Sequence, residues 1–272
     1  TGEHAPRQLM QIEGTRAQAE FIDPQFAPKL DSLTYPQFFL DIETLRSVIP
    51  AHKGAKVNGL SLFQFSIHRR DVPGGPLEHT DWLNTEPECP NVRFLGALRD
   101  ALGEEGSILI WTRYEEASFK ELLADLIGDG VESDDMCWLK RLLVSDRVVD
   151  LHELCFAHYW HPHMVGRTSI KAVLPAVWSE DSPVKLRVPY NEFPVDADPY
   201  GTLKKNGDVS DGCDAMSAYL AMLSGSPEAK QELLRYCRVD TLAMCFIEDY
   251  WRWRLRHSNN GKLIASAELS AA

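Results

Sequence analysis

The sequence predicts an α/β fold built on a five-stranded mixed sheet, with an antiparallel three-stranded half and a parallel half, flanked by helices. Two observations support this prediction. Three apolar or alternating segments follow one another in the first third of the chain, which is typical of an antiparallel meander. Short buried strands then alternate with stretches of helical periodicity, which is the order that parallel strands require.

The central strand is predicted over residues 38–44, an apolar and aromatic run after Pro36 that contains Asp41 and Glu43. Because side chains repeat every two residues along a strand, both carboxylates point the same way. Two such acids repel each other and resist desolvation, so a divalent metal is an obvious positive partner. So short a pattern is also found at solvated strand ends, and the other acids of the chain must decide.

The remaining strands of the antiparallel half follow directly. Residues 60–68 alternate between apolar and polar side chains, and residues 77–83 form a third strand after the Pro-Gly turn at 73–76. Helical spacing then appears in residues 92–102, and Gly103 ends that helix.

The parallel half is predicted from two further strands at residues 107–111 and 147–150, with helices around 119–126 and 136–143 between them. Asp150 and Glu153 fit a capping box for the next helix. Residues 179–210 are rich in Pro, Gly and charges and predict a long loop. Two helices follow, from Asp211 and from Ser226-Pro227, where a cap residue and a proline open the last one.

These elements define one domain over residues 31–257, preceded by an N-terminal arm or linker (residues 1–30) and followed by a tail (residues 258–272). The first residue is Thr1, which favours a processed chain or an excised part of a longer protein. Neither a signal peptide nor a membrane-spanning run is found. The six cysteines show no Cys-x-x-Cys spacing, which favours reduced thiols in a cytoplasmic protein.

Charge limits the functional classes. With 28 Lys+Arg against 40 Asp+Glu, the formal net charge is −12, which argues against a generic basic nucleic-acid binder. An enzyme whose acids hold metals, with its cations gathered in one groove, remains compatible with this balance.

Two further acidic motifs accompany Asp41 and Glu43. On the last helix, Tyr236 and Asp240 are four residues apart and share one face. After the fourth strand, Glu115 and Glu116 stand at the start of a helix, where acids also favour the helix dipole. Adjacent helical residues point about 100° apart, so these two glutamates cannot both face one metal pair.

Together these motifs resemble the DnaQ-like 3′–5′ exonucleases of the RNase H-like superfamily, in the Asp-Glu-Asp-Asp group whose third motif is Tyr-x-x-x-Asp. Several stretches resemble, more narrowly, a bacterial domain-of-unknown-function family within that group, and the match covers about residues 35 to 250. Those stretches are YPQFFLDIET (35–44), FQFSIH (63–68), DLHEL (150–154), TSIKAVLP (168–175), DGCDA (211–215) and YCRVDTLAM (236–244).

The resemblance implies a two-metal phosphodiesterase that uses Mg²⁺ or Mn²⁺ on single-stranded DNA or RNA 3′ ends, without a membrane. It implies that Asp41 bridges both metals, that Glu43 and Asp240 complete the ligand set, and that Tyr236 orients the attacking water. Glu115 is favoured over Glu116 as the motif-two acid, because it follows Tyr114 as the family's acid follows an aromatic residue; the family usually has an aspartate here. The asparagine common upstream is absent, with Trp111-Thr112 in its place, and the extra methylene of a glutamate puts the metal spacing or occupancy at the second site in doubt.

Other residues are weaker candidates. Thr44, Arg167 and Lys171 are predicted substrate contacts, the last two because they flank a helix start at Thr168-Ser169 that suits a phosphate, with a plain helix cap as the alternative. A cluster of one cysteine and three histidines could hold zinc, although its spacing matches no standard zinc finger. Residues 251–257 interleave aromatics with cations, which suits either single-stranded nucleic acid or a helix C-terminus. The zinc cluster comprises Cys155, His158, His161 and His163.

The sequence leaves three functions open. A metal-dependent 3′–5′ exonuclease is favoured by the retention of Asp41, Glu43, Tyr236 and Asp240. A catalytically weak RNase H-like module that binds nucleic acid or a partner is favoured by the replacement at Glu115. Members of the family it resembles are often fused to a second nuclease domain, which suits such a module. An RNase H-like endonuclease is the third.

Overall fold

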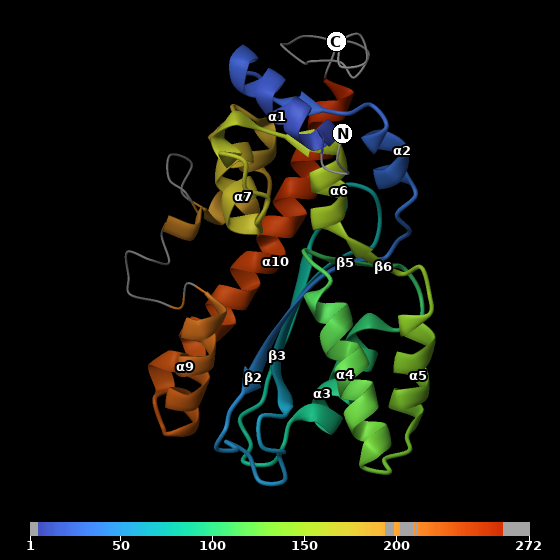
Figure 1. Ribbon diagram of the computed structural model, residues 1–272, viewed down its shortest axis with the longest axis vertical. Helices are drawn as coiled ribbons and strands as arrows, with labels where there is room; N and C mark the ends of the chain where they lie inside the picture. Colours follow the sequence, from blue (N-terminus) through green and yellow to red (C-terminus); the bar gives the residue numbers. More distant parts are fainter. Residues whose placement is uncertain (1–4, 194–198, 202–208, 210, 258–272) are drawn as a thin grey trace.

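The structure is a computed structural model that describes residues 5–193, 199–201, 209 and 211–257 (Figure 1). Its sheet has five strands in the order β4-β3-β2-β5-β6. β2, β3 and β4 pair antiparallel, and β5 and β6 continue in parallel from β2. This confirms the predicted mixed sheet, which fits an RNase H-like domain. The strands are β2 (Gln37–Arg46), β3 (Leu60–Arg70), β4 (Glu78–Leu83), β5 (Ser107–Ile110) and β6 (Val148–Asp150).

Alternation along β2 assigns its side chains to two separate cores. Phe38, Leu40 and Ile42 pack into one hydrophobic cluster, and Phe39 and Leu45 belong to the other. Asp41 and Glu43 share the parity of Phe39, so they lie on the second face. The pairing with β3 shifts at the step from Glu43 to Thr44, a bulge of the kind that often re-aims side chains beside functional sites.

The first face of the sheet is covered by three helices, which lie together in Figure 1. α3 (Asn91–Leu102) ends at Gly103, whose φ of 55° is readily adopted by glycine. α5 (Asp134–Leu143) begins after Ser133, whose side chain accepts a hydrogen bond from the Met136 backbone amide. The third helix on this face is α4 (Tyr114–Gly128).

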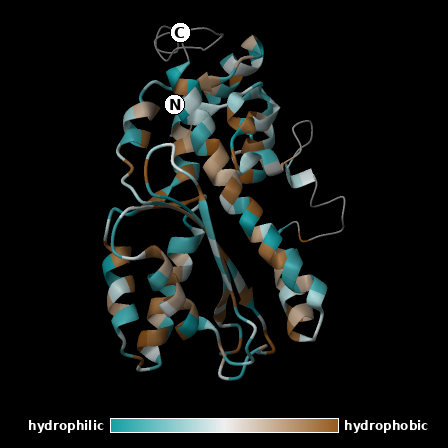
Figure 2. Ribbon diagram, turned by 180° about the vertical axis from the view of Figure 1, so that it is seen from behind, coloured by the Kyte–Doolittle hydropathy of each residue, from teal (hydrophilic) through white to brown (hydrophobic). Residues whose placement is uncertain are grey.

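The second face is crossed by the long helix α10 (Pro227–Arg256), which packs against β2 and β3 (Figure 1). Hydrophobic and hydrophilic residues alternate along this helix in Figure 2, as expected when one of its faces covers a sheet. α9 (Gly212–Leu223) and α7 (Ile170–Ser179) pack beside it. Asp211 caps α9 by accepting hydrogen bonds from the amides of Cys213 and Asp214.

The N-terminal arm, predicted without regular structure, contains two helices and a short strand. β1 (Phe21–Ile22) pairs antiparallel with β7 (Tyr159–Trp160). A Cβ at Gly14 would lie 2.2 Å from the Trp160 ring, so only glycine allows this close packing. The arm is therefore built into the domain surface. Its helices are α1 (Ala5–Ala17) and α2 (Phe26–Asp31).

Further short elements in the described part of the chain include α6 (Leu151–His158) and the 3₁₀ turns η1 (Pro162–Met164), η2 (Pro183–Leu186) and η3 (Tyr190–Glu192). The predicted loop at residues 179–210 is thus partly structured, and the rest of it, like the tail at 258–272, largely lies outside the described residues. No helix in the described part of the chain is both long and apolar enough to span a bilayer.

Candidate metal centre

Four carboxylates from three elements converge on the α10 face of the sheet. Asp41 and Glu43 come from the middle of β2, Glu115 from the first turn of α4, and Asp240 from α10. Glu43, Glu115 and Asp240 are buried, with 5 to 8% of their surface exposed, and Asp41 is half-buried. These carboxylates lie close enough together that repulsion between them raises the pKa values of Asp41, Glu43 and Glu115.

Local structure explains this convergence. β2 and β5 are parallel neighbours, so the end of β5 delivers the start of α4 to the edge of the sheet near Glu43. α10 crosses β2 with Cys237 against it, and the Cys237 thiol donates to Asp41 Oδ2 at 3.1 Å. Asp240 lies one turn further along the same helix.

Burial makes these acids hard to ionise. It raises the pKa of Asp41 to about 8, with the Asp240 charge as the next cause. It raises the pKa of Glu43 well above its usual value, and repulsion from Asp41 and Asp240 adds to this effect. The pKa of Glu115 is also raised, first by burial and then by Asp41. The centre therefore needs positive charge to be fully ionised at neutral pH.

Lys171 supplies part of that charge from the first turn of α7. It lowers the pKa values of Asp41, Glu43 and Asp240, against the larger effect of burial. Its Nζ donates a hydrogen bond to the Tyr236 hydroxyl at 3.0 Å. Tyr236 is itself buried, and burial followed by the Asp240 charge raises its pKa far above the usual value, so it keeps its proton.

Two features show that the centre has unused ligand capacity. Glu115 Oε2 is buried without a hydrogen-bond partner, and the Glu43 carboxylate accepts no hydrogen bond from any residue that the structure describes. Buried carboxylate oxygens without donors are expensive. A divalent cation suits them, since oxygen ligands and negative charge are what such ions require. Ligand atoms of Asp41, Glu43 and Cys237 also lie within 4.8 Å of one another and form a possible metal site.

Glu115 and Glu116 are separated in the way that their helical positions predict. Glu115 points inward, whereas Glu116 forms ion pairs with Arg113 at 3.3 Å and with Lys120. The interior glutamate is therefore the one placed near Asp41 and Asp240.

Of the three predicted substrate contacts, two lie at or beside the centre and the third is exposed at the surface. Lys171 lies inside the centre, and Thr44 is buried beside it on β2, hydrogen-bonded to the Tyr114 hydroxyl. Arg167 is exposed before α7, and the Ser169 side chain makes no capping hydrogen bond there.

The cysteine and histidine cluster does not form a metal site among the described residues. Cys155 is buried in the core, and the His158 and His161 rings pair with Asp23 and Glu180, each at 3.0 Å. His163 bonds Ser179. These side chains instead tie α6 and η1 to their surroundings.

The aromatic and basic stretch at the end of α10 is also structural. Trp251 is fully buried, Arg252 bonds Asp31 and Glu248, and Arg254 bonds Glu20. Two of the arginines of this stretch are thus already paired with acids of the chain, which disfavours the alternative that the stretch contacts nucleic acid.

Two residues of the centre were not anticipated. Cys237 lies between Tyr236 and Asp240, and its helical position, 60° from Asp240, was the available signal. Tyr200 donates a hydrogen bond to Asp240 Oδ1 from within the long loop, where no sequence period could have identified it.

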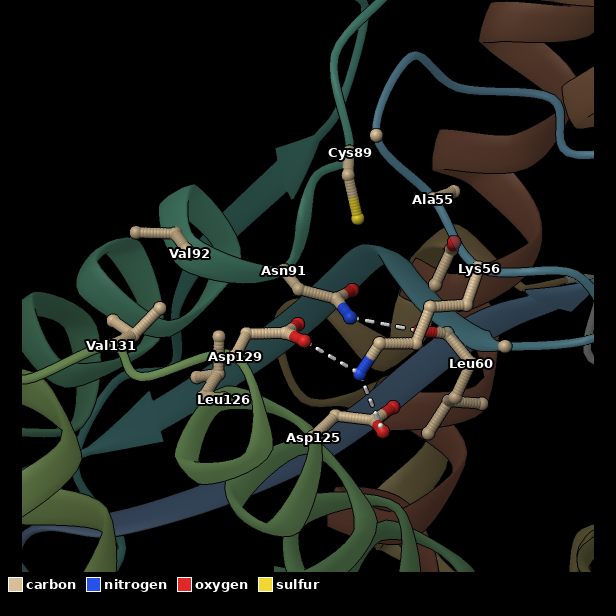
Figure 3. Close-up of a pocket in the computed structure, with 13 residues that line it drawn as sticks. Ala55, Lys56, Leu60, Cys89, Asn91, Val92, Asp125, Leu126, Asp129 and Val131 are labelled. Carbon is tan, nitrogen blue, oxygen red and sulfur yellow. Dashed lines mark hydrogen bonds and ion pairs between the residues drawn. The ribbon is translucent and has the colours of Figure 1, made fainter.

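A separate pocket of about 180 Å³ lies between the loop after β2 and the helices α3 and α4 (Figure 3). Lys56 crosses it and pairs with Asp125 at 3.2 Å and Asp129 at 3.0 Å. None of the predicted site residues lines it, and its lysine is already neutralised, so it is not the acidic centre.

Fold and site together define an α/β domain that is compatible with the RNase H-like class and carries a buried acidic centre. Residues 38–169 match a family described as "Domain of unknown function (DUF2779)". That match includes Asp41, Glu43 and Glu115, whereas Lys171, Tyr236 and Asp240 lie beyond it. No curated protein and no solved structure matches the chain.

Proposed function

We propose that this domain is a metal-dependent 3′–5′ exonuclease that hydrolyses phosphodiester bonds at single-stranded nucleic-acid ends, with Mg²⁺ or Mn²⁺ as its cofactor. The observation that carries the proposal is the convergence of four carboxylates, three of them buried, for which Lys171 supplies only part of the balancing positive charge. In the described part of the chain none of the four forms an ion pair within 4.0 Å. Such a charge excess is costly for stability alone and is suited to holding divalent ions.

Each side chain has a defined part in this proposal. Asp41, Glu43, Glu115 and Asp240 would hold two divalent ions, which when bound activate water and stabilise the leaving 3′ oxygen. Asp41 is best placed to be shared, since it interacts with Glu43, Glu115 and Asp240.

Tyr236 would orient the attacking water. Its hydroxyl accepts a hydrogen bond from Lys171, and its raised pKa keeps its own proton available to be donated to an oxygen atom. Lys171 fixes the phenol and brings a positive charge to a place where a phosphate must approach four acids.

One observation favours a catalytically weak module that binds nucleic acid or a partner. Tyr200 donates a hydrogen bond to Asp240, so a ligand oxygen of the centre is already used by the protein. The glutamate in place of the usual aspartate at position 115 points in the same direction.

The deciding assay uses end-labelled DNA and RNA oligonucleotides with Mg²⁺ or Mn²⁺, with and without a chelator. We expect products that shorten stepwise from a free 3′ end, a block by a 3′ phosphate, and loss of activity in Asp41→Ala. Asp81→Ala, an exposed acid on β4, is the matched control. Undiminished cleavage by Asp41→Ala would refute the nuclease centre, and equal cleavage of a circular strand would favour an endonuclease.

A further inference from the structure

The acidic centre contains a thiol as well as carboxylates. Cys237 is fully buried on the sheet-facing side of α10, and its Sγ lies 3.1 Å from Asp41 Oδ2. One ligand atom of each of Asp41, Glu43 and Cys237 lies within 4.8 Å of the other two. The sulfur therefore shares the space in which a cation would be held.

The spacing suits an ion that accepts both sulfur and oxygen. Zn²⁺ binds thiolate sulfur at about 2.3 Å and carboxylate oxygen at about 2.0–2.2 Å, so sulfur and oxygen ligands of one tetrahedral ion lie roughly 3.5 Å apart. Cys237 Sγ and Asp41 Oδ2 lie 3.1 Å apart and the three ligand atoms lie within 4.8 Å of one another, which is close to this spacing. Mg²⁺ prefers oxygen ligands and gains nothing from the sulfur.

A second, independent feature points to a ligand at this place. Glu43 as a residue is about nine-tenths buried and its carboxylate accepts no hydrogen bond from the described residues, and Glu115 Oε2 is buried without a partner. These oxygens remain available to complete a coordination shell that begins with Asp41 and Cys237.

We propose that Cys237, Asp41 and Glu43 bind a thiophilic divalent ion of the zinc class, and that this ion competes with the Mg²⁺ or Mn²⁺ of the proposed nuclease. On binding, the S–H bond of Cys237 breaks, a sulfur–metal bond forms and the proton passes to water, with no change of oxidation state. The site itself stands on the geometry of the three side chains. Only the inhibitory consequence rests on the proposed function.

The test titrates Co²⁺, a spectroscopic substitute for Zn²⁺, into protein in which the three cysteines that are not buried are replaced by serine. These are Cys89, Cys137 and Cys213. A thiolate ligand gives a sulfur-to-cobalt charge-transfer absorption in the near ultraviolet, which needs no catalytic activity. We expect this band to saturate at one equivalent of metal and to disappear when Zn²⁺ is added in excess.

Cys245→Ala is the matched control, because Cys245 is buried on the same helix two turns away from Cys237. The band should persist in Cys245→Ala and vanish in Cys237→Ser, with the affinity for Co²⁺ weakened by roughly 100-fold or more. Circular dichroism confirms that each variant is folded. A band that survives in Cys237→Ser, or cobalt binding without a sulfur band in the parent protein, would overturn the proposal.

The consequence for activity is measured separately. In Mg²⁺-dependent cleavage assays, Zn²⁺ should inhibit the parent protein and inhibit Cys237→Ser at least about tenfold less strongly. If no nuclease activity is found, the cobalt band still decides whether Cys237 is a ligand. If activity is present but equally zinc-sensitive in both proteins, competition through Cys237 is refuted while the nuclease stands.

Discussion

Replacing Asp41 by asparagine should stabilise the metal-free protein at alkaline pH. The folded protein raises the pKa of Asp41 from 3.8 to about 8, with burial as the main cause. The folded state therefore binds this proton more tightly than the unfolded state does. The contribution of this group to the free energy of unfolding is fully present below about pH 4 and is lost progressively as the pH rises towards 8. Above about pH 8 it does not fall further. Asparagine has a similar shape and no charge to desolvate.

The magnitude follows from the size of the shift. A change of about four pKa units corresponds to roughly 6 kcal/mol as an upper bound, at about 1.4 kcal/mol per unit. Asp41 is half-buried, so water screens part of the penalty, and we expect about 2–3 kcal/mol at pH 8. The gain at pH 4 should be small, because this pH lies close to the unfolded-state pKa of 3.8 and far below the folded-state pKa, so little of the penalty has developed.

The assay is urea unfolding followed by tryptophan fluorescence, at pH 4 and pH 8, with a chelator or with Mg²⁺. The difference between Asp41→Asn and the parent protein reports the Asp41 carboxylate together with its repulsion of Glu43 and Glu115, whose pKa values it raises. Mg²⁺ should stabilise the parent protein and stabilise Asp41→Asn much less. If Asp41→Asn is equally destabilising at both pH values in the chelator, the carboxylate is not under the electrostatic strain inferred here.

Three further substitutions test the remaining parts of the argument. Glu115→Gln should lower metal-dependent turnover by about 100-fold or more, whereas Glu116→Gln, at an exposed ion pair, should change it little; equal effects in the cleavage assay would reverse the assignment. Lys171→Met should lower turnover and reduce metal-free stability at pH 8, because it removes the cation that lowers three acidic pKa values, while Lys120→Met serves as the surface control. Arg70→Met should lower the free energy of unfolding in urea by about 3–5 kcal/mol, because Glu248 and Asp249 lose their buried partner. The exposed neighbour Arg69→Met should lower it by no more than about 1 kcal/mol, and similar losses in the two variants would contradict the importance of burial.

Much of the sheet could be predicted because its signals are local. The apolar run around Asp41, the alternation in residues 60–68 and the turn at 73–76 specify β2, β3 and β4 by periodicity alone. The pairing of β1 with β7 could not be predicted, since two residues carry no period and their partners lie about 140 positions away. α1 was missed for a related reason, because its polar residues hide the few that contact Trp160.

The centre itself was predictable only where residue spacing fixes direction. Alternation on β2 places Asp41 and Glu43 on one face, and the 100° step of a helix separates Glu115 from Glu116. Lys171 could be placed near a helix start, but not against Tyr236, because that contact depends on how α7 packs on α10. Tyr200 required the course of a loop, which no periodicity encodes.

The strongest reason to regard the centre as functional comes from a second set of buried acids on the same helix. About two turns beyond Asp240, Glu248 and Asp249 are also buried or nearly so, and Arg70 reaches both, at 2.9 and 2.8 Å. Arg252 also bonds Glu248, and the Tyr190 hydroxyl donates to Asp249 at 2.6 Å.

α10 therefore shows how this fold neutralises acids that serve stability: it gives them arginines and hydrogen-bond donors. Around Asp41 the same helix supplies a thiol, a phenol and another carboxylate instead, and within the described residues no arginine lies within 4.0 Å of the four acids. A structural role would need the first arrangement. The second leaves charge and ligand oxygens for something that the chain does not itself provide, and a divalent cation meets both requirements.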